Sequence, residues 1–171
     1  GPGQIDLGLT TIAANGDSAG RIEIRADGNI TFAGLDAQAL GLVVPTNNDT
    51  EESLTGIFIA PIGGTIASQG AVTLTTDGSV GVYAQSNGIF DVDGILTIAA
   101  VDQIDIRHDA RTGTAATLQA SDNLIATAGT SISAAPGSLI GSGNLLSLAV
   151  TGPTGTIGVD RLAGNDILLS S

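Results

Sequence analysis

The feature that most constrains this chain is a recurring pattern of short segments in which apolar and polar residues alternate. Ile22-Glu23-Ile24 and Val72-Thr73-Leu74 are two examples, and a two-residue period is that of a β-strand. Gly, Asp, Asn or Ser bounds each segment, and these residues favour tight turns. Because no segment holds apolar residues at the helical period of 3.6, the pattern predicts an all-β fold.

Turn residues followed by an apolar strand also recur at a nearly constant spacing. In the second half of the chain four copies begin 20, 21 and 21 residues apart: Asp102–Ile106, Asp122–Ala126, Gly143–Ser147 and Gly164–Leu168. A repeat of this length with two or three strands corresponds to one coil of a parallel β-helix. We therefore predict a right-handed, single-stranded parallel β-helix (β-solenoid) with about 20 residues per coil and about seven or eight coils.

Composition supports a narrow interior and limits the partners. The chain has 25 Gly, three Phe, one Tyr and no Trp, Met or Cys, so large aromatic residues cannot fill a wide core. The formal charge of −12 and the absence of Lys argue against binding to nucleic acid or to an anionic membrane surface. No apolar stretch approaches the ~20 residues of a membrane-spanning helix, so we expect no membrane insertion.

The chain is predicted to form one domain with one polar excursion. Residues 1–3, Gly-Pro-Gly, are interpreted as the remnant of a cleaved purification tag, and residues 4–171 as a single β-solenoid. Residues 36–56 are polar, acidic and rich in turn-forming residues. We predict that this segment is an insertion that leaves the coil.

The runs bounded by Gly, such as Gly70-Ala71-Val72-Thr73-Leu74-Thr75-Thr76-Asp77-Gly78, resemble the repeat regions of filamentous haemagglutinin-like large exoproteins. The resemblance covers most of residues 4–171 and lies in pattern and composition rather than in a diagnostic motif. It implies a β-helical shaft for cell adhesion, exported by two-partner secretion and located outside the bacterium or on its cell surface. The secretion domain of that family carries Asn-Pro motifs, and no Asn-Pro dipeptide occurs here, which implies an internal or distal segment.

The densest polar cluster contains two carboxylates, two guanidinium groups and the one His of the chain: Asp105, Arg107, His108, Asp109 and Arg111. Polysaccharide lyases and hydrolases built on β-helices gather such groups from neighbouring coils on one face. With the predicted repeat, Ile125 and Leu146 would follow Asp105 in the next two coils, so no carboxylate would stack over it. We interpret the cluster as a solvated strand end and predict no catalytic residue and no enzymatic activity.

Acidic residues recur at turn positions: Asp27, Asp77, Asp102 and Asp122. The repeat predicts that Asp102 and Asp122 lie about one coil apart, at roughly 5 Å, a separation that a bridging Ca²⁺ would fit. The other interpretation is that Asp at turns hydrogen-bonds the local backbone. We predict no metal and no cofactor, with Ca²⁺ as the alternative.

Four amide side chains occupy equivalent places in the predicted repeat: Gln103, Asn123, Asn144 and Asn165. Stacked amides hydrogen-bond from one layer to the next in other parallel β structures. We predict that these residues form a structural ladder.

The prediction for function is a structural or adhesive shaft, with flanking solenoid repeats as its partners and host glycans or host proteins as its contacts. The alternative is a β-helical enzyme or tailspike-like module that acts on or binds polysaccharide. That alternative would need clustered carboxylates or exposed aromatic rings, and aromatic residues are only 2% of the chain.

Overall fold

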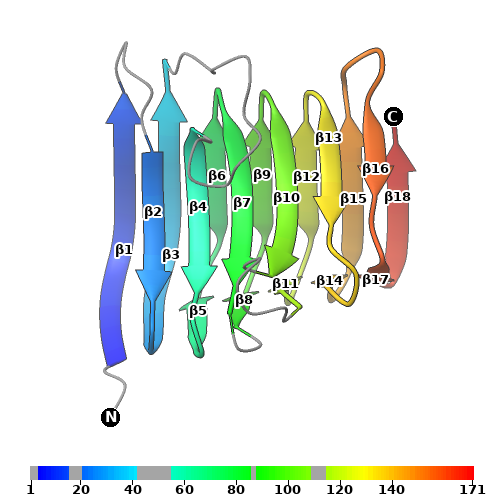
Figure 1. The fold of residues 1–171 in the computed structure, drawn as a ribbon. Helices are drawn as coiled ribbons and strands as arrows, with labels where there is room; N and C mark the ends of the chain where they lie inside the picture. The colour runs from blue at the N-terminus through cyan, green and yellow to red at the C-terminus, as the bar shows by residue number, and fades with distance from the viewer. Residues whose placement is uncertain (1–3, 16–20, 42–54, 86–87, 109–114) are drawn as a thin grey trace.

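A computed structural model describes residues 4–15, 21–41, 55–85, 88–108 and 115–171 of the chain. These ranges contain eighteen strands and no helix, so they hold no helix long and apolar enough to cross a membrane. All the paired strands run parallel, and the chain winds as a β-solenoid of about 6 turns (Figure 1). The predicted all-β parallel solenoid is confirmed, with about 6 turns rather than the seven or eight that the sequence predicted.

Three strands per coil form three faces. The first face is a sheet of six strands, β2 (Arg21–Ala26), β4 (Gly56–Pro61), β7 (Ser79–Ala84), β10 (Gln103–His108), β13 (Ser131–Ala134) and β16 (Thr156–Gly158). The second face holds β5 (Thr65–Ser68), β8 (Ile89–Val92), β11 (Thr117–Ala120), β14 (Leu139–Ser142) and β17 (Arg161–Ala163). The third face holds β6 (Val72–Thr76), β9 (Leu96–Ala100), β12 (Leu124–Ala128), β15 (Leu145–Val150) and β18 (Asp166–Ser170).

Two longer strands join the second and third faces into one sheet of twelve. β3 (Asn29–Leu40) pairs with β5 through its first residues and with β6 through its last. β1 (Gln4–Asn15) pairs with β3 along its length. At the N-terminal end of the stack, β1 and β3 therefore each run through both the second and the third face.

The coil is longer than the predicted 20 residues, at roughly 25 residues per turn. The strand register shows why: Ile104 pairs with Val80 and Ile132 on the first face, whereas Leu124 pairs with Leu96 and Leu146 on the third. The segments that begin at Asp102 and Asp122 are therefore on different faces. The strand and turn segments of one coil resemble each other as closely as those of successive coils. The sequence alignment therefore treated two segments of the same coil as equivalent positions in successive coils.

The interior consists of aliphatic ladders parallel to the stack. Leu74, Ile98, Ala126 and Leu148 are in register on the third face and are essentially inaccessible to solvent. Their strands alternate buried with exposed or half-buried residues, as the two-residue period predicts. The narrow core that composition indicated is thus confirmed for the described residues.

Glycine lies where the corners of successive coils touch. A β-carbon on Gly129 would overlap the carbonyl oxygen of Val101, and one on Gly143 would overlap that of Ser121. Gly78 is placed in the same way against Thr55. Close approach between coils, rather than a left-handed backbone, is what requires glycine at these three positions.

The predicted insertion falls partly outside the described residues. Residues 36–40 belong to β3 and Gly56 begins β4, so the prediction was wrong for both ends of the 36–56 segment, and residues 42–54 lie outside the described residues. The paired positions Leu35 and Val72 are 37 residues apart by subtraction, whereas Val72 and Leu96 are 24 apart. This coil is therefore longer than its neighbours.

Candidate functional site

Carboxylates on the outside of the solenoid are bound to the neighbouring coils. Asp102 accepts hydrogen bonds from Ser79 Oγ (2.8 Å) and Thr130 Oγ1 (3.1 Å), one coil to either side. Asp91 accepts one from Gln119 Nε2 (3.0 Å), and Asp93 accepts one from Ser121 Oγ (2.9 Å). These acidic residues link coils along the stack.

The structure places Asp105 in such a link as well. Its backbone neighbours on adjacent coils are Gly81 and Ser133 and not the predicted Ile125 and Leu146, so that part of the sequence alignment was wrong. Asp105 is buried, and its Oδ1 accepts a hydrogen bond from Ser133 Oγ (2.8 Å). It is therefore not a solvated residue.

Of the predicted polar cluster, the structure describes only the Asp105 side chain. Arg107 and His108 end β10, but their side chains are outside what the structure describes, as are residues 109–114. Neither Gly81 nor Ser133 supplies a second carboxylate beside Asp105. The described part of the cluster therefore lacks the paired acids that glycoside hydrolysis uses.

Asp102 and Asp122 do not stack, which corrects the geometry on which the Ca²⁺ alternative depended. The backbone amide of Asp102 bonds to Gly78 and that of Asp122 bonds to Gly94, so the two residues follow different faces of the coil. Within the described ranges, no group of three or more His, Asp or Glu residues is placed to hold a metal ion.

Two of the four amide side chains, those of Asn123 and Asn165, link coils through backbone groups and not through the predicted ladder of stacked amides. Gln103 lies on the first face beside Ser131. Asn123 Oδ1 accepts a hydrogen bond from the Leu145 amide (3.2 Å), and Asn165 Nδ2 donates to the Gly143 carbonyl (2.8 Å). Asn123 therefore bonds to the backbone of the following coil, and Asn165 to the backbone of the preceding one.

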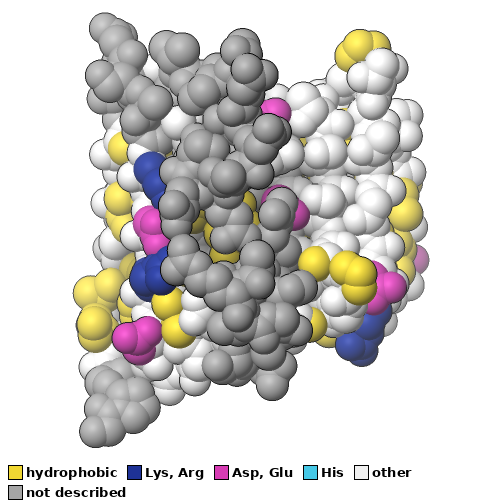
Figure 2. All heavy atoms as spheres, in the orientation of Figure 1, with side chains coloured by type: hydrophobic (Ala, Val, Ile, Leu, Met, Phe, Trp, Pro, Cys, Tyr) yellow, Lys and Arg dark blue, Asp and Glu magenta, His cyan; other side chains and the backbone are white. Residues whose placement is uncertain are grey.

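The outer side of the first face carries an aromatic pair that the sequence analysis missed. The rings of Phe58 and Tyr83 stack with centroids 5.6 Å apart, and the Arg21 guanidinium lies 3.8 Å from the Phe58 ring centre. Glu23 receives hydrogen bonds from Arg25 (2.8 Å) and Arg21 (3.1 Å). Figure 2 shows basic and acidic side chains side by side on this edge of the molecule.

Burial acts to raise the pKa of the Glu23 carboxyl, but the hydrogen bonds and positive charges of Arg25 and Arg21 outweigh it, so this pKa lies below its ordinary value. Glu23 therefore stays ionised at neutral pH.

Phe58 and Tyr83 are both buried although strand alternation turns them away from the core. With Phe32 and Phe90 also buried, no Phe or Tyr of this chain offers an exposed platform for a sugar ring.

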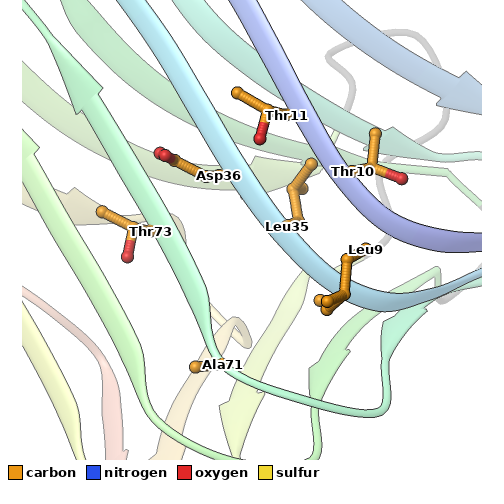
Figure 3. Close-up of a pocket in the computed structure, with 8 residues that line it drawn as sticks. Leu9, Thr10, Thr11, Leu35, Asp36, Ala71 and Thr73 are labelled. Carbon is orange, nitrogen blue, oxygen red and sulfur yellow. The ribbon is translucent and has the colours of Figure 1, made fainter.

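A shallow groove of about 300 Å³ crosses β1, β3 and β6 (Figure 3). Thr11, Asp36 and Thr73 are in register across its floor, and Leu9 and Ala71 lie at its end. Asp36 accepts hydrogen bonds from Gln38 Nε2 at 3.1 and 3.3 Å. The groove offers hydroxyls and one carboxylate to a polar ligand, but it contains neither a His nor a second acid.

The link through Asp102 gives the first testable prediction. Asp102→Ala removes two hydrogen bonds to a charged acceptor at a half-exposed position, so we expect a loss of about 2 kcal/mol in the free energy of unfolding. Asp102→Asn keeps one carbonyl acceptor and should lose less than half of that. Urea denaturation measures both values.

Asp27→Ala is the matched control, because Asp27 is an exposed turn carboxylate and such surface changes usually cost within about 0.5 kcal/mol. Equal losses for Asp27→Ala and Asp102→Ala would contradict the proposed link between coils.

Comparison of the chain with protein-family models, with curated protein sequences and with solved structures gives no match.

Proposed function

We propose that this chain is a structural and adhesive shaft segment of a large secreted bacterial surface protein of the filamentous haemagglutinin-like type, without catalysis of its own. The observation that carries the proposal is the unbroken register from β1 to β18. Every coil repeats the pairing of the coil before it, so added coils extend reach without a new fold. The carboxylate links between coils stiffen this stack further.

The partners in this proposal follow from the same geometry. Flanking solenoid coils would continue the ladders in the parent protein. Host glycans or host proteins would contact the outer faces, where the groove over β1, β3 and β6 offers Thr11, Asp36 and Thr73. The place of action would be outside the bacterium or on its cell surface.

Pulling the chain by its two ends tests the proposal. A shaft of stacked coils should extend one coil at a time, because the hydrogen bonds between coils run along the pulling direction and break strand by strand. With about 25 residues per turn and about 3.4 Å per extended residue, less one strand spacing, each step should be about 80 Å. Optical-tweezers traces with one cooperative rupture of the whole chain would contradict a shaft built of repeated units.

The second candidate function is binding or cleavage of polysaccharide, and the groove with Asp36 is the observation that favours it. The buried positions of all Phe and Tyr residues count against it. Incubation with a panel of acidic polysaccharides, followed by assay of reducing ends and unsaturated products, separates the two functions. Turnover that Asp36→Asn abolishes would replace the shaft proposal with an enzyme.

A further inference from the structure

A second groove, of about 310 Å³, lies on the outer side of the second face, over β8, β11, β14 and β17. These strands lie side by side along the lower edge of the molecule in Figure 1. The floor of the groove is Gly141 on β14, which stands in register between Gln119 on β11 and Ala163 on β17. Because β14 is paired on both sides, this groove, called here the Gly141 groove, belongs to the side of the stack and not to either end.

The packing of the coils does not require a glycine at position 141. Gly141 does not have a left-handed backbone, and a β-carbon there would touch only the β-carbons of Gln119 and Ala163, at 3.8 and 3.9 Å. Glycine inside a strand weakens the strand, and it often marks a place where a ligand approaches the backbone closely. The missing side chain thus leaves room for a ligand rather than for a neighbouring coil.

The wall of the groove on the β11 side presents hydrogen-bond acceptors. Gln119 Nε2 donates to Asp91 Oδ1 (3.0 Å), so the Gln119 side chain leans toward β8 and away from the floor. The Ser121 hydroxyl donates to Asp93 Oδ1 (2.9 Å). The described residues supply no donor to Asp91 Oδ2 or to Gln119 Oε1. These two oxygens are therefore open to donors from a ligand.

The other sides of the groove include the apolar side chains of Leu139, Ala120 and Ala163. A matching ligand would donate hydrogen bonds along one edge and present C–H groups to the floor. A pyranose ring does both, through adjacent hydroxyls on its edge and C–H groups on its face. A Lys ammonium gathers its three donors at one point, and an extended peptide would turn carbonyl oxygens toward the Asp91 carboxylate.

Charge limits which sugars fit. The chain carries a formal charge of −12 and Asp91 lines the groove itself, so sialylated, sulfated and uronate glycans are repelled. We propose that the Gly141 groove binds one neutral pyranose unit of a glycan, with Asp91 and Gln119 accepting hydrogen bonds from adjacent hydroxyls and the ring lying over Gly141. This inference rests on the adhesive part of the proposed function and names its ligand class.

NMR titration of the isotope-labelled full chain with the methyl glycosides of glucose, galactose, mannose and N-acetylglucosamine tests the proposal. At least one glycoside should shift the amide signals of β11 and β14, with a dissociation constant on the order of 1 mM, because the groove is shallow and has no aromatic ring. N-acetylneuraminic acid should shift none of them. Binding of a neutral sugar should be the same at low and high NaCl.

Two variants locate the binding site. Gly141→Ala places a methyl group where the ring would lie, and Asp91→Asn removes the charged acceptor but keeps an oxygen for Gln119. Each should raise the dissociation constant by about tenfold, the effect of one lost hydrogen bond to a charged group. The matched controls are Gly158→Ala, which adds the same methyl group to open space on the first face, and Asp27→Asn, which removes one charge from an exposed turn. Both controls should bind as the wild type does, and circular dichroism verifies that all four variants are folded.

Trilysine is the competing probe. If trilysine shifts the signals of β11 and β14 and the glycosides do not, the groove binds a basic peptide and the proposal is wrong. Absence of binding by all four glycosides, or binding that neither Gly141→Ala nor Asp91→Asn weakens, would also overturn it. The pulling experiment separates these failures from failure of the shaft: stepwise extension without sugar binding removes only the groove, and sugar binding with a single rupture removes only the shaft.

Discussion

Replacing Gly129 with alanine is expected to lower the free energy of unfolding by about 3 kcal/mol and the midpoint of thermal unfolding by about 10 °C. The new β-carbon would overlap the carbonyl oxygen of Val101 in the preceding coil. The two corners would have to separate, although the Gly129 amide hydrogen-bonds the Ala100 and Asp102 carbonyls there. Differential scanning calorimetry measures the loss.

Gly141→Ala is the matched control for this substitution. Gly141 lies in β14 on the outer side of the second face, where a β-carbon would meet only the β-carbons of Gln119 and Ala163, at 3.8 and 3.9 Å. Such spacing is ordinary van der Waals contact, so we expect a change within about 0.5 kcal/mol. If both glycines tolerate alanine equally, close approach of the coils does not explain the glycine content.

Replacing Phe90 with alanine is expected to lower the free energy of unfolding by 3 to 5 kcal/mol, the range for removal of a buried ring. Phe90 on β8 stands in register between Ile66 and Leu118 and is inaccessible to solvent. Backbone pairing on both sides fixes the strand positions, so the cavity cannot collapse by moving one coil. Chemical denaturation followed by circular dichroism gives the value.

Ile89→Ala tests whether the effect belongs to the interior row. Ile89 is the neighbouring residue of the same strand and has the opposite, half-buried orientation. We expect a loss below about 1 kcal/mol. A loss as large as that of Phe90→Ala would mean that the core does not lie where the ladders place it.

The sequence predicted the class of fold because alternation within strands and turn residues between them are local signals. It did not predict the length of a coil, because strands on different faces look alike: Asp102-Gln103-Ile104 resembles Asp122-Asn123-Leu124 but follows another face. Only the pairing of residues far apart in the sequence, such as Leu96 with Leu124, shows whether two similar segments lie in one coil or in successive coils.

The same error in register explains which site predictions were wrong. Asp105 has Gly81 and Ser133 as neighbours because its coil partners are 24 and 28 residues away, not 20. The polar links of Asp102 to Ser79 and Thr130 could not be found for the same reason. The stacked Phe58 and Tyr83 carry a weak sequence signal, because each occupies an outward position in a strand where the period predicts a polar residue.

The unequal coils have a consequence for how such a chain diversifies. The paired residues Leu35 and Val72 are 37 residues apart in the sequence. The aliphatic rows nevertheless keep the same register on both sides of this longer coil. The register of the ladders fixes the position of each strand, but it does not fix the number of residues between one strand and the next. An insertion at a corner of the coil can therefore add surface residues without changing the packing of the aliphatic core.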